Sequence, residues 1–511
     1  MAVDSLRETR HINRISKNDL SVLWSAQSYR PDVTKAVRKI RNMTWRPLAQ
    51  LCVNAIGPGP HPNFTSTGHP CLKTKNVLGV VVDASEVDFT EPFNTIRWPH
   101  YCIEREDLVL NVTGAGSIGR VGMYFGEDRP LTNQHLARLS ITPSVDAAFV
   151  CAFLASWWGE RALEQGISGS TGQLNLVNDH IRQLPVPVPD IASQRYIGDK
   201  VRQAERLRAR ARKLEQESAT FFRIAEWTQP RAGHRRAYVA ARRVMRGERL
   251  DAPFYDPAHD ALEAVLQARG ALPLSELASL VEKRWKRVGE EFAYFEIGEL
   301  DIASGVLSPS RLPVSAAPSR AQICVEPWDV LVSTVRPNRK NVGLVPASIE
   351  RLALVASTGF AALRFSTLEQ AVFYHAFLRS DAATQQLMRW NSGATYPAIE
   401  NDVPLRVLAP SFDDDVVQQK GARWLQKFRA LDASERLTTA SKLLVEHLID
   451  GRLTEADLVA AQKGLEAGNR DADRAILQTL RQGEGADAAP LIPDIDTLYA
   501  LLDEPDEGSH T

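Results

Sequence analysis

The chain repeats part of its own sequence, at an offset that stays between 222 and 226 residues. Tyr29 and Pro31 recur as Tyr255 and Pro257, and each pair precedes a stretch of helical character. Further matches in the same order are Pro47-Leu48 with Pro273-Leu274, Asp107 with Asp329, Ser168–Thr171 with Ser392–Thr395, Asn178-Asp179 with Asn401-Asp402, and Pro187 with Pro410. A collinear series of this length predicts two copies of one structural module.

Each copy ends in a proline-containing connection followed by a long helical stretch. The first stretch runs from about residue 193 to 226, and Leu207, Ala211 and Leu214 begin an apolar stripe at spacings of four and three. The second runs from about 415 to 450, and Gly451 stands where a C-terminal glycine is expected. Two helices packed separately on their own domains remain an alternative. The repeat favours an antiparallel pair, about 50 Å long, that relates two globules by approximate twofold symmetry.

We therefore predict an α/β fold with pseudo-twofold symmetry, in which two mixed α/β domains are joined by a pair of long antiparallel coiled-coil helices. The chain of 511 residues is long enough for several structural units. The predicted domains are 1–190 and 231–412, the spacer helices are 191–230 and 413–451, and residues 452–511 form an acidic C-terminal tail.

Charge is distributed unevenly along the chain. Residues 451–511 hold 13 acidic and 5 basic side chains, so the remainder carries −1 − (−8) = +7. Residues 191–249 hold 16 basic and 6 acidic side chains. A basic helix is compatible with DNA, because arginines neutralise phosphates. Pairing with an acidic partner subunit and a solvated helical face are the alternatives.

The order of motifs resembles the specificity subunits of type I restriction-modification systems. In the first copy DLVLNVTGAGSIGRVGMYF, LTNQHLARL and SGSTGQLNLVNDHIRQLPVPVP are similar to a target recognition domain. The second copy carries RLDAPFYDP, DVLVSTVRPNRKNVGLV, STGFAAL and SGATYPAIENDVPLRVLAP, with a terminal LLVEHLIDGRL. The resemblance covers about residues 20–453.

Five scattered cysteines without a CxxC pair predict a cytoplasmic location with reduced thiols. The resemblance implies a non-catalytic subunit of a DNA adenine methyltransferase or restriction complex. Each target recognition domain would read one half of a bipartite site in double-stranded DNA. The long helices would set the spacing and dock two methyltransferase subunits, with a motor-nuclease subunit as a possible addition. S-adenosylmethionine, and any ATP and Mg²⁺, would be held by those partners and not by this chain.

Polar loops supply the candidate DNA contacts. Gly114 to Gly119 fits GxGxxG, but a strand-like run follows it instead of a helix, so a turn between two strands is expected rather than a dinucleotide site. Arginine and asparagine can read guanine and adenine edges, and hydroxyls can bind phosphates. Purely structural turns, and capping of local backbone by Asn133 and Gln134, remain alternatives. The predicted DNA contacts are Thr113, Ser117, Arg120, Asn133, Gln134, Ser170, Thr171 and Gln173 in the first copy, and Arg336, Asn338, Arg339, Lys340, Asn341, Thr395 and Tyr396 in the second.

The sequence lacks the motifs of a self-sufficient enzyme. It contains no Asn/Asp-Pro-Pro-Tyr run of an amino-methyltransferase, no Walker phosphate loop, and no HExxH or CxxC metal pattern. Asp107 and Asp329 are interpreted as turn or strand-cap residues at strand starts. A coiled-coil adaptor that joins other subunits without reading DNA is the alternative function, and the basic loops argue against it.

Overall fold

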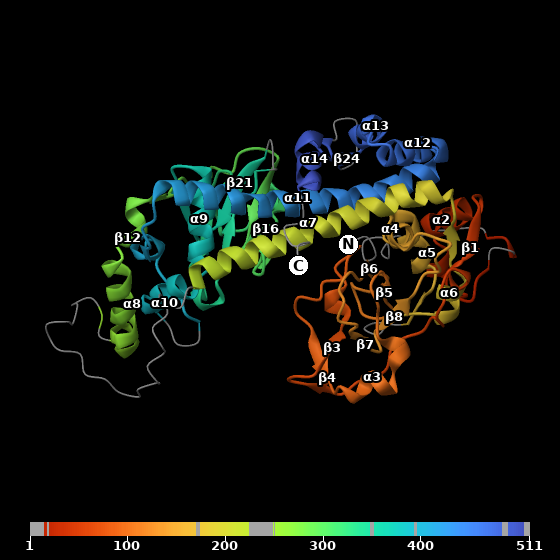
Figure 1. The fold of residues 1–511 in the computed structure, drawn as a ribbon, viewed down its shortest axis with the longest axis horizontal. Coiled ribbons are helices and arrows are strands. Elements are labelled where there is room, and N and C mark those ends of the chain that lie inside the picture. Colours follow the sequence, from red (N-terminus) through yellow and green to blue (C-terminus); the bar gives the residue numbers. More distant parts are fainter. Residues whose placement is uncertain are drawn as a thin grey trace. The chain divides into compact units, whose positions relative to one another are not determined.

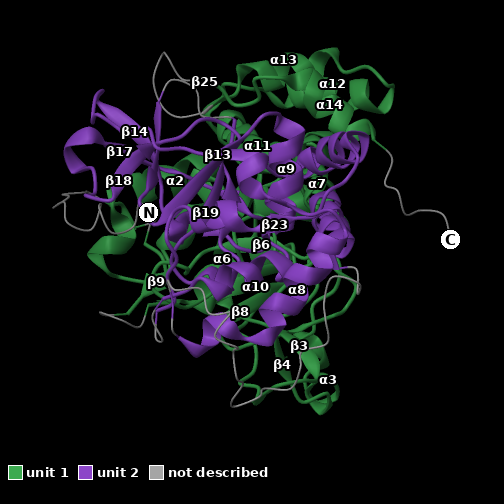
Figure 2. Ribbon diagram, turned by 90° about the vertical axis from the view of Figure 1, so that its left-hand side faces the viewer, with its two compact units in different colours: residues 1–208, 432–511 green, residues 209–431 purple. Residues whose placement is uncertain are grey.

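The computed structural model describes residues 15–17, 20–169, 174–223, 249, 251–347, 352–392, 396–482 and 489–504. The chain divides into two compact units (Figure 2). The first unit comprises residues 1–208 and 432–511, and the second comprises residues 209–431. Among the described residues no helix is long and apolar enough to cross a membrane.

The first unit is mixed α/β (Figure 1). Its central three-stranded sheet has the order β6-β5-β8, and a four-stranded sheet has the order β2-β4-β3-β7. Apolar residues such as Leu108 and Val109 fill β5, which is buried on both faces. The bounds are α2 Pro31–Arg41, β1 Trp45–Pro47, β2 Phe64–Thr65, β3 His69–Leu72, β4 Asp88–Thr90, α3 Phe93–Arg97, β5 Leu108–Asn111, β6 Val121–Met123, β7 Leu131–Thr132, β8 Leu136–Leu139, α4 Ala147–Leu154, α5 Trp157–Glu164, β9 Ile167–Ser168, β10 Asn175–Leu176, α6 Asn178–Gln183 and β11 Pro185–Pro187.

The second unit contains a larger pair of sheets. Six strands have the order β13-β22-β19-β20-β16-β15, and four have the order β17-β14-β21-β18. The bounds are α8 Pro257–Ala268, β12 Leu272–Pro273, β13 Ala278–Leu280, β14 Glu291–Phe295, β15 Leu300–Asp301, β16 Val306–Leu307, β17 Ser310–Pro313, β18 Ala321–Cys324, β19 Val330–Ser333, β20 Val342–Leu344, β21 Ala353–Ser357, β22 Phe360–Phe365, α9 Leu368–Leu378, α10 Asp381–Arg389 and β23 Leu408–Ala409.

The predicted repeat is confirmed at the level of elements and of single residues. In the first unit β5 pairs antiparallel with β6 and β8, and in the second β19 pairs antiparallel with β20 and β22. The hydroxyl of Tyr29 donates to Leu23 O at 2.6 Å, and that of Tyr255 donates to Arg249 O at 2.6 Å. Both tyrosines therefore close the same turn, six residues back along the chain, just before α2 or α8.

Two long helices, α7 Ile191–Arg223 and α11 Asp414–Asp450, contact each other within each unit. In the first unit Arg208 Nη2 donates to Thr438 Oγ1 at 2.8 Å. In the second, Arg210 Nη2 lies 2.7 Å from Gln426 Oε1, and Glu217 Oε2 accepts from Arg423 Nε at 2.7 Å. Partner numbers fall as α7 numbers rise, so the predicted antiparallel pairing is confirmed.

In the second unit a half-buried carboxylate connects the two helices to the domain. Glu215 in α7 accepts from Lys427 in α11 at 2.6 Å and from Arg379 at 2.8 Å. Burial opposes the charge of Glu215, but the two cations outweigh it and hold its pKa below the usual value.

Replacing Glu215 by glutamine is expected to lower the free energy of unfolding by about 2 kcal/mol, because the buried Lys427 and the half-buried Arg379 lose their counter-charge. Urea unfolding of the full chain measures this change. Glu217→Gln is the matched control, since its partners Lys420 and Arg423 are about one-third exposed and water screens the loss. Equal losses in the two variants would contradict this account.

Residues 452–511, expected from composition only as an acidic tail, contain three helices: α12 Glu455–Glu466, α13 Asp471–Thr479 and α14 Ile495–Asp503 (Figure 1). Leu458, Leu477 and Leu498 are buried, which shows that these helices contribute to the first unit's core. A two-stranded pairing of β24 Arg481–Gln482 with β25 Ala489–Pro490 joins α13 to α14. The acidic composition of this segment did not indicate the apolar residues that its helices bury.

Candidate nucleic-acid interface

The first candidate loop connects β5 to β6 and runs from Thr113 to Arg120. Gly114, Gly116 and Gly119 have φ values of 102°, 80° and 84°, a region that favours glycine. The flanking strands are antiparallel, so this GxGxxG run turns a hairpin and does not open a helix. The predicted turn between two strands is confirmed.

The polar side chains of this loop are held partly by the loop itself. Arg120 is exposed, and its Nη2 donates to Gly116 O at 2.9 Å. Ser117 and Thr113 are half-buried, and Ser117 Oγ lies 3.5 Å from Thr113 O. Arg120 is therefore the most accessible of the three predicted contacts at this turn.

His135 organises the neighbouring residues. Its Nδ1 lies 2.6 Å from Thr113 Oγ1, and its Nε2 lies 3.0 Å from Gln134 Nε2. Asn133 is 2% exposed, and its Oδ1 accepts the His135 N–H at 3.1 Å. Asn133 therefore caps a local backbone N–H, which is one of the two alternatives that the sequence left open. DNA contact by Asn133 and Gln134 stays a prediction. The sequence had placed His135 beside Asn133 and Gln134, as a residue that could either reach a groove edge or cap local backbone.

The second candidate loop connects β19 to β20 and is built around the short 3₁₀ helix Pro337–Arg339. Arg336 and Lys340, on either side of it, have positive φ values of 52° and 57°. Asn338 and Arg339 are exposed, while Asn341 is only 6% exposed. Lys340 Nζ forms an ion pair with Asp381 Oδ1 at 2.7 Å, which fixes the loop against α10.

Arg336 and Tyr396, predicted separately from the sequence, lie together in the second unit. The guanidinium carbon of Arg336 is 4.8 Å from the centre of the Tyr396 ring. The Arg336 N–H donates to Pro397 O at 2.7 Å, and Tyr396 is 64% exposed. A cation held on an exposed aromatic ring presents both hydrogen-bond donors and a stacking face to solvent.

Four predicted contacts, Ser170, Thr171, Gln173 and Thr395, lie outside the described residues. The structure therefore places Arg120 at the end of one hairpin loop, directly before β6. It places Arg336, Asn338 and Arg339 in the other hairpin loop, with Tyr396 against Arg336. Residues 224–248 of the basic stretch also lie outside the described part. On α7, Arg202 pairs with Asp146 at 3.0 Å, so helix arginines contribute to packing as well as to charge.

An aspartate at the start of each hairpin's first strand bonds an arginine on the neighbouring strand. Asp107 accepts from Glu104 N and from Arg138 Nε at 2.7 Å, and Asp329 accepts from Glu326 N and from Arg364 Nε at 2.8 Å. Each arginine lies on the strand paired with the loop's first strand. The interpretation of both aspartates as strand-start caps is confirmed, since each caps the N–H three residues earlier.

Asp329→Asn is expected to lower the free energy of unfolding by about 1–2 kcal/mol, because the bidentate bond to Arg364 loses its charge. Asp107→Asn is expected to cost a similar amount, because Asp107 also accepts two side-chain hydrogen bonds, one from Arg138 Nε and one from Ser140 Oγ. Thermal unfolding of both variants measures this. A loss confined to one copy would argue against equivalent supports.

No protein-family model and no curated protein matches the chain. Among solved structures, it is similar to the S subunit of a type I restriction-modification system from M. genitalium, at 14% identity and a TM-score of 0.39, over 80% of this chain and 96% of that one. It is similar to the HsdS subunit from Thermoanaerobacter tengcongensis at 14% identity and a TM-score of 0.26, over 80% and 97% of the two chains. A structure describing assembly and conformational transition of the type I R-M system aligns at 13% identity and a TM-score of 0.24, over 82% and 97%.

Proposed function

We propose that the chain is the DNA-recognition subunit of a type I-like restriction-modification complex. The observation that carries the proposal is the duplicated hairpin, which occurs once in each unit with the same supporting aspartate and arginine. Each hairpin ends in a polar loop, and cations stand at exposed positions in both. Two copies of one DNA-contacting hairpin suit a bipartite target. In each half, loop side chains would read bases and other polar groups would bind phosphates.

The two loops differ in chemistry, which supports different half-sites. The first is rich in glycine and carries Arg120, so its backbone can approach DNA closely. The second carries Arg336, Asn338 and Arg339, side chains able to read guanine and adenine in the major groove. Each half of the chain therefore recognises its own sequence.

Catalysis belongs to partner subunits in this proposal. Among the described residues there is no group of three or more His, Cys, Asp or Glu side chains placed to hold a metal ion. Methyltransferase subunits that bind S-adenosylmethionine dock on the paired helices α7 and α11, and a motor-nuclease subunit using ATP and Mg²⁺ can join them. The chain supplies sequence recognition and spacing.

Incubation of the purified full chain with radiolabelled duplexes of random sequence tests the DNA-binding part. We expect binding that weakens steeply as salt rises, because phosphate contacts release counterions. Absence of binding at 50 mM salt, alone and with co-expressed methyltransferase subunits, would refute the proposal and favour an adaptor.

A further inference from the structure

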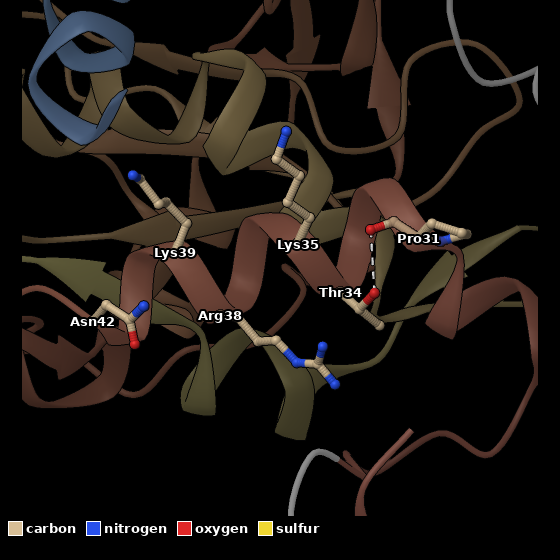
Figure 3. A pocket seen from close by; sticks show the side chains of 6 residues that line it. All are labelled: Pro31, Thr34, Lys35, Arg38, Lys39 and Asn42. Atoms are coloured by element: carbon tan, nitrogen blue, oxygen red, sulfur yellow. Dashed lines mark hydrogen bonds between the residues drawn. The ribbon is translucent and has the colours of Figure 1, made fainter. Parts of the chain in front are cut away.

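One face of α2 in the first unit carries a hollow of about 330 Å³ (Figure 3). Its lining residues are Pro31, Thr34, Lys35, Arg38, Lys39 and Asn42. Three of the six are cations and none is acidic. In Figure 3 Lys35 and Lys39 extend to the same side of the helix.

The two lysines are available to a ligand. Lys35 is exposed and Lys39 is half-exposed. Within the part of the chain that the structure describes, neither ammonium group forms an ion pair with a carboxylate. By contrast, Arg30 at the start of the helix is buried and pairs with Asp32 and Glu164 at 3.0 and 2.7 Å. Arg30 is therefore a structural cation of this helix, whereas Lys35 and Lys39 keep their charges available for a ligand.

The equivalent helix in the second unit shows that the fold does not require this charge. Aligning Pro31 with Pro257 places Lys35, Arg38 and Lys39 on Ala261, Ala264 and Val265 of α8. Both helices begin with proline at their first turn and both bury apolar residues on the inner face. A cationic face present in only one of two matched helices points to a ligand specific to the first unit.

We propose that Lys35 and Lys39 bind two backbone phosphates of the duplex that the first unit contacts. This inference rests on the proposed function. The two lysines lie one helical turn apart, about 6 Å along the axis, so both can reach phosphates of one DNA strand, which recur every ~3.4 Å of duplex axis. The hollow is polar and cationic, as DNA interfaces are, and it lacks the apolar centre of a protein–protein interface.

The test uses the full-length chain, a random-sequence duplex and a selected target duplex at several salt concentrations. The double variant K35A/K39A should bind both duplexes roughly tenfold more weakly at 0.15 M salt, and its salt slope should fall by about 2, because two phosphate contacts are lost. Base preference should not change. Lys463→Ala, at an exposed position of α12, is the control and should leave affinity and slope unchanged.

An unchanged slope in K35A/K39A, with wild-type binding intact, would overturn the inference and leave the proposed function standing. Weakened assembly with methyltransferase subunits at unchanged DNA affinity would also overturn it, because the face would then serve a protein partner. Failure of the wild-type chain to bind either duplex would instead refute the proposed function.

Discussion

Replacing Asp473 by asparagine is expected to lower the free energy of unfolding of the first unit by about 3–5 kcal/mol. Asp473 in α13 accepts from Lys200 Nζ at 2.6 Å, Tyr196 Oη at 2.7 Å and Tyr499 Oη at 2.7 Å. Asp473 is 1% exposed and Lys200 2%, so the substitution leaves a buried ammonium group without its counter-charge. Urea unfolding, followed by tryptophan fluorescence, measures the loss.

The double variant D473N/K200M separates the charge effect from simple loss of packing. Removing both charges should recover much of the stability, because an apolar pair of similar volume needs no counter-charge. If the double variant is as unstable as D473N, the unpaired ammonium group is not the cause.

This cluster also predicts an acid-dependent change in stability. Burial opposes ionisation of Asp473, but the charge of Lys200 and hydrogen bonds from Lys200 and the two tyrosines hold its pKa below the usual value. A depressed pKa in the folded state contributes stability above the unfolded-state value near 4, which is lost as pH falls toward the folded value. D473N should therefore show a shallower decline than the wild type below about pH 4.

The double variant R336A/R339A is expected to abolish recognition of one half-site while the other is retained. A bidentate arginine–guanine contact contributes about 1–3 kcal/mol of discrimination, so loss of two such contacts should lower specificity for that half-site by roughly 30-fold or more. Selection of binding sites from a random duplex library, with and without the substitutions, measures this directly.

Arg120→Ala is the reciprocal variant. It should relax the other half-site and leave the half-site of Arg336 and Arg339 intact. Unchanged unfolding curves would show that both variants fold, since all three side chains lie in surface loops. Loss of the same bases in both variants would contradict independent reading by the two loops.

Periodicity and duplication were enough to predict the architecture. The offset of 226 between Tyr29 and Tyr255 predicted two copies of one module, and the stripe through Leu207 and Leu214 predicted a helix packed along a partner. Both predictions are confirmed, because they depend on the order of repeated residues and the spacing of apolar residues, which can be observed in the sequence.

The sequence could not predict contacts made between distant residues. Nothing near Arg336 indicates that Tyr396 lies against its guanidinium, because a loop some 60 residues away brings the ring there. Likewise, net charge alone suggested a tail after residue 451, whereas Asp473 is buried against Lys200 of α7. Charge composition records how many ions a segment holds, not which of them are paired inside the fold.

The central claim, that two equivalent hairpins read two separate half-sites, is tested most directly by selecting bound duplexes from a random library with the wild-type chain and the proposed methyltransferase subunits. The account predicts two short conserved blocks separated by a gap of fixed length and no sequence preference. A single uninterrupted block, or no enrichment of any sequence, would contradict it.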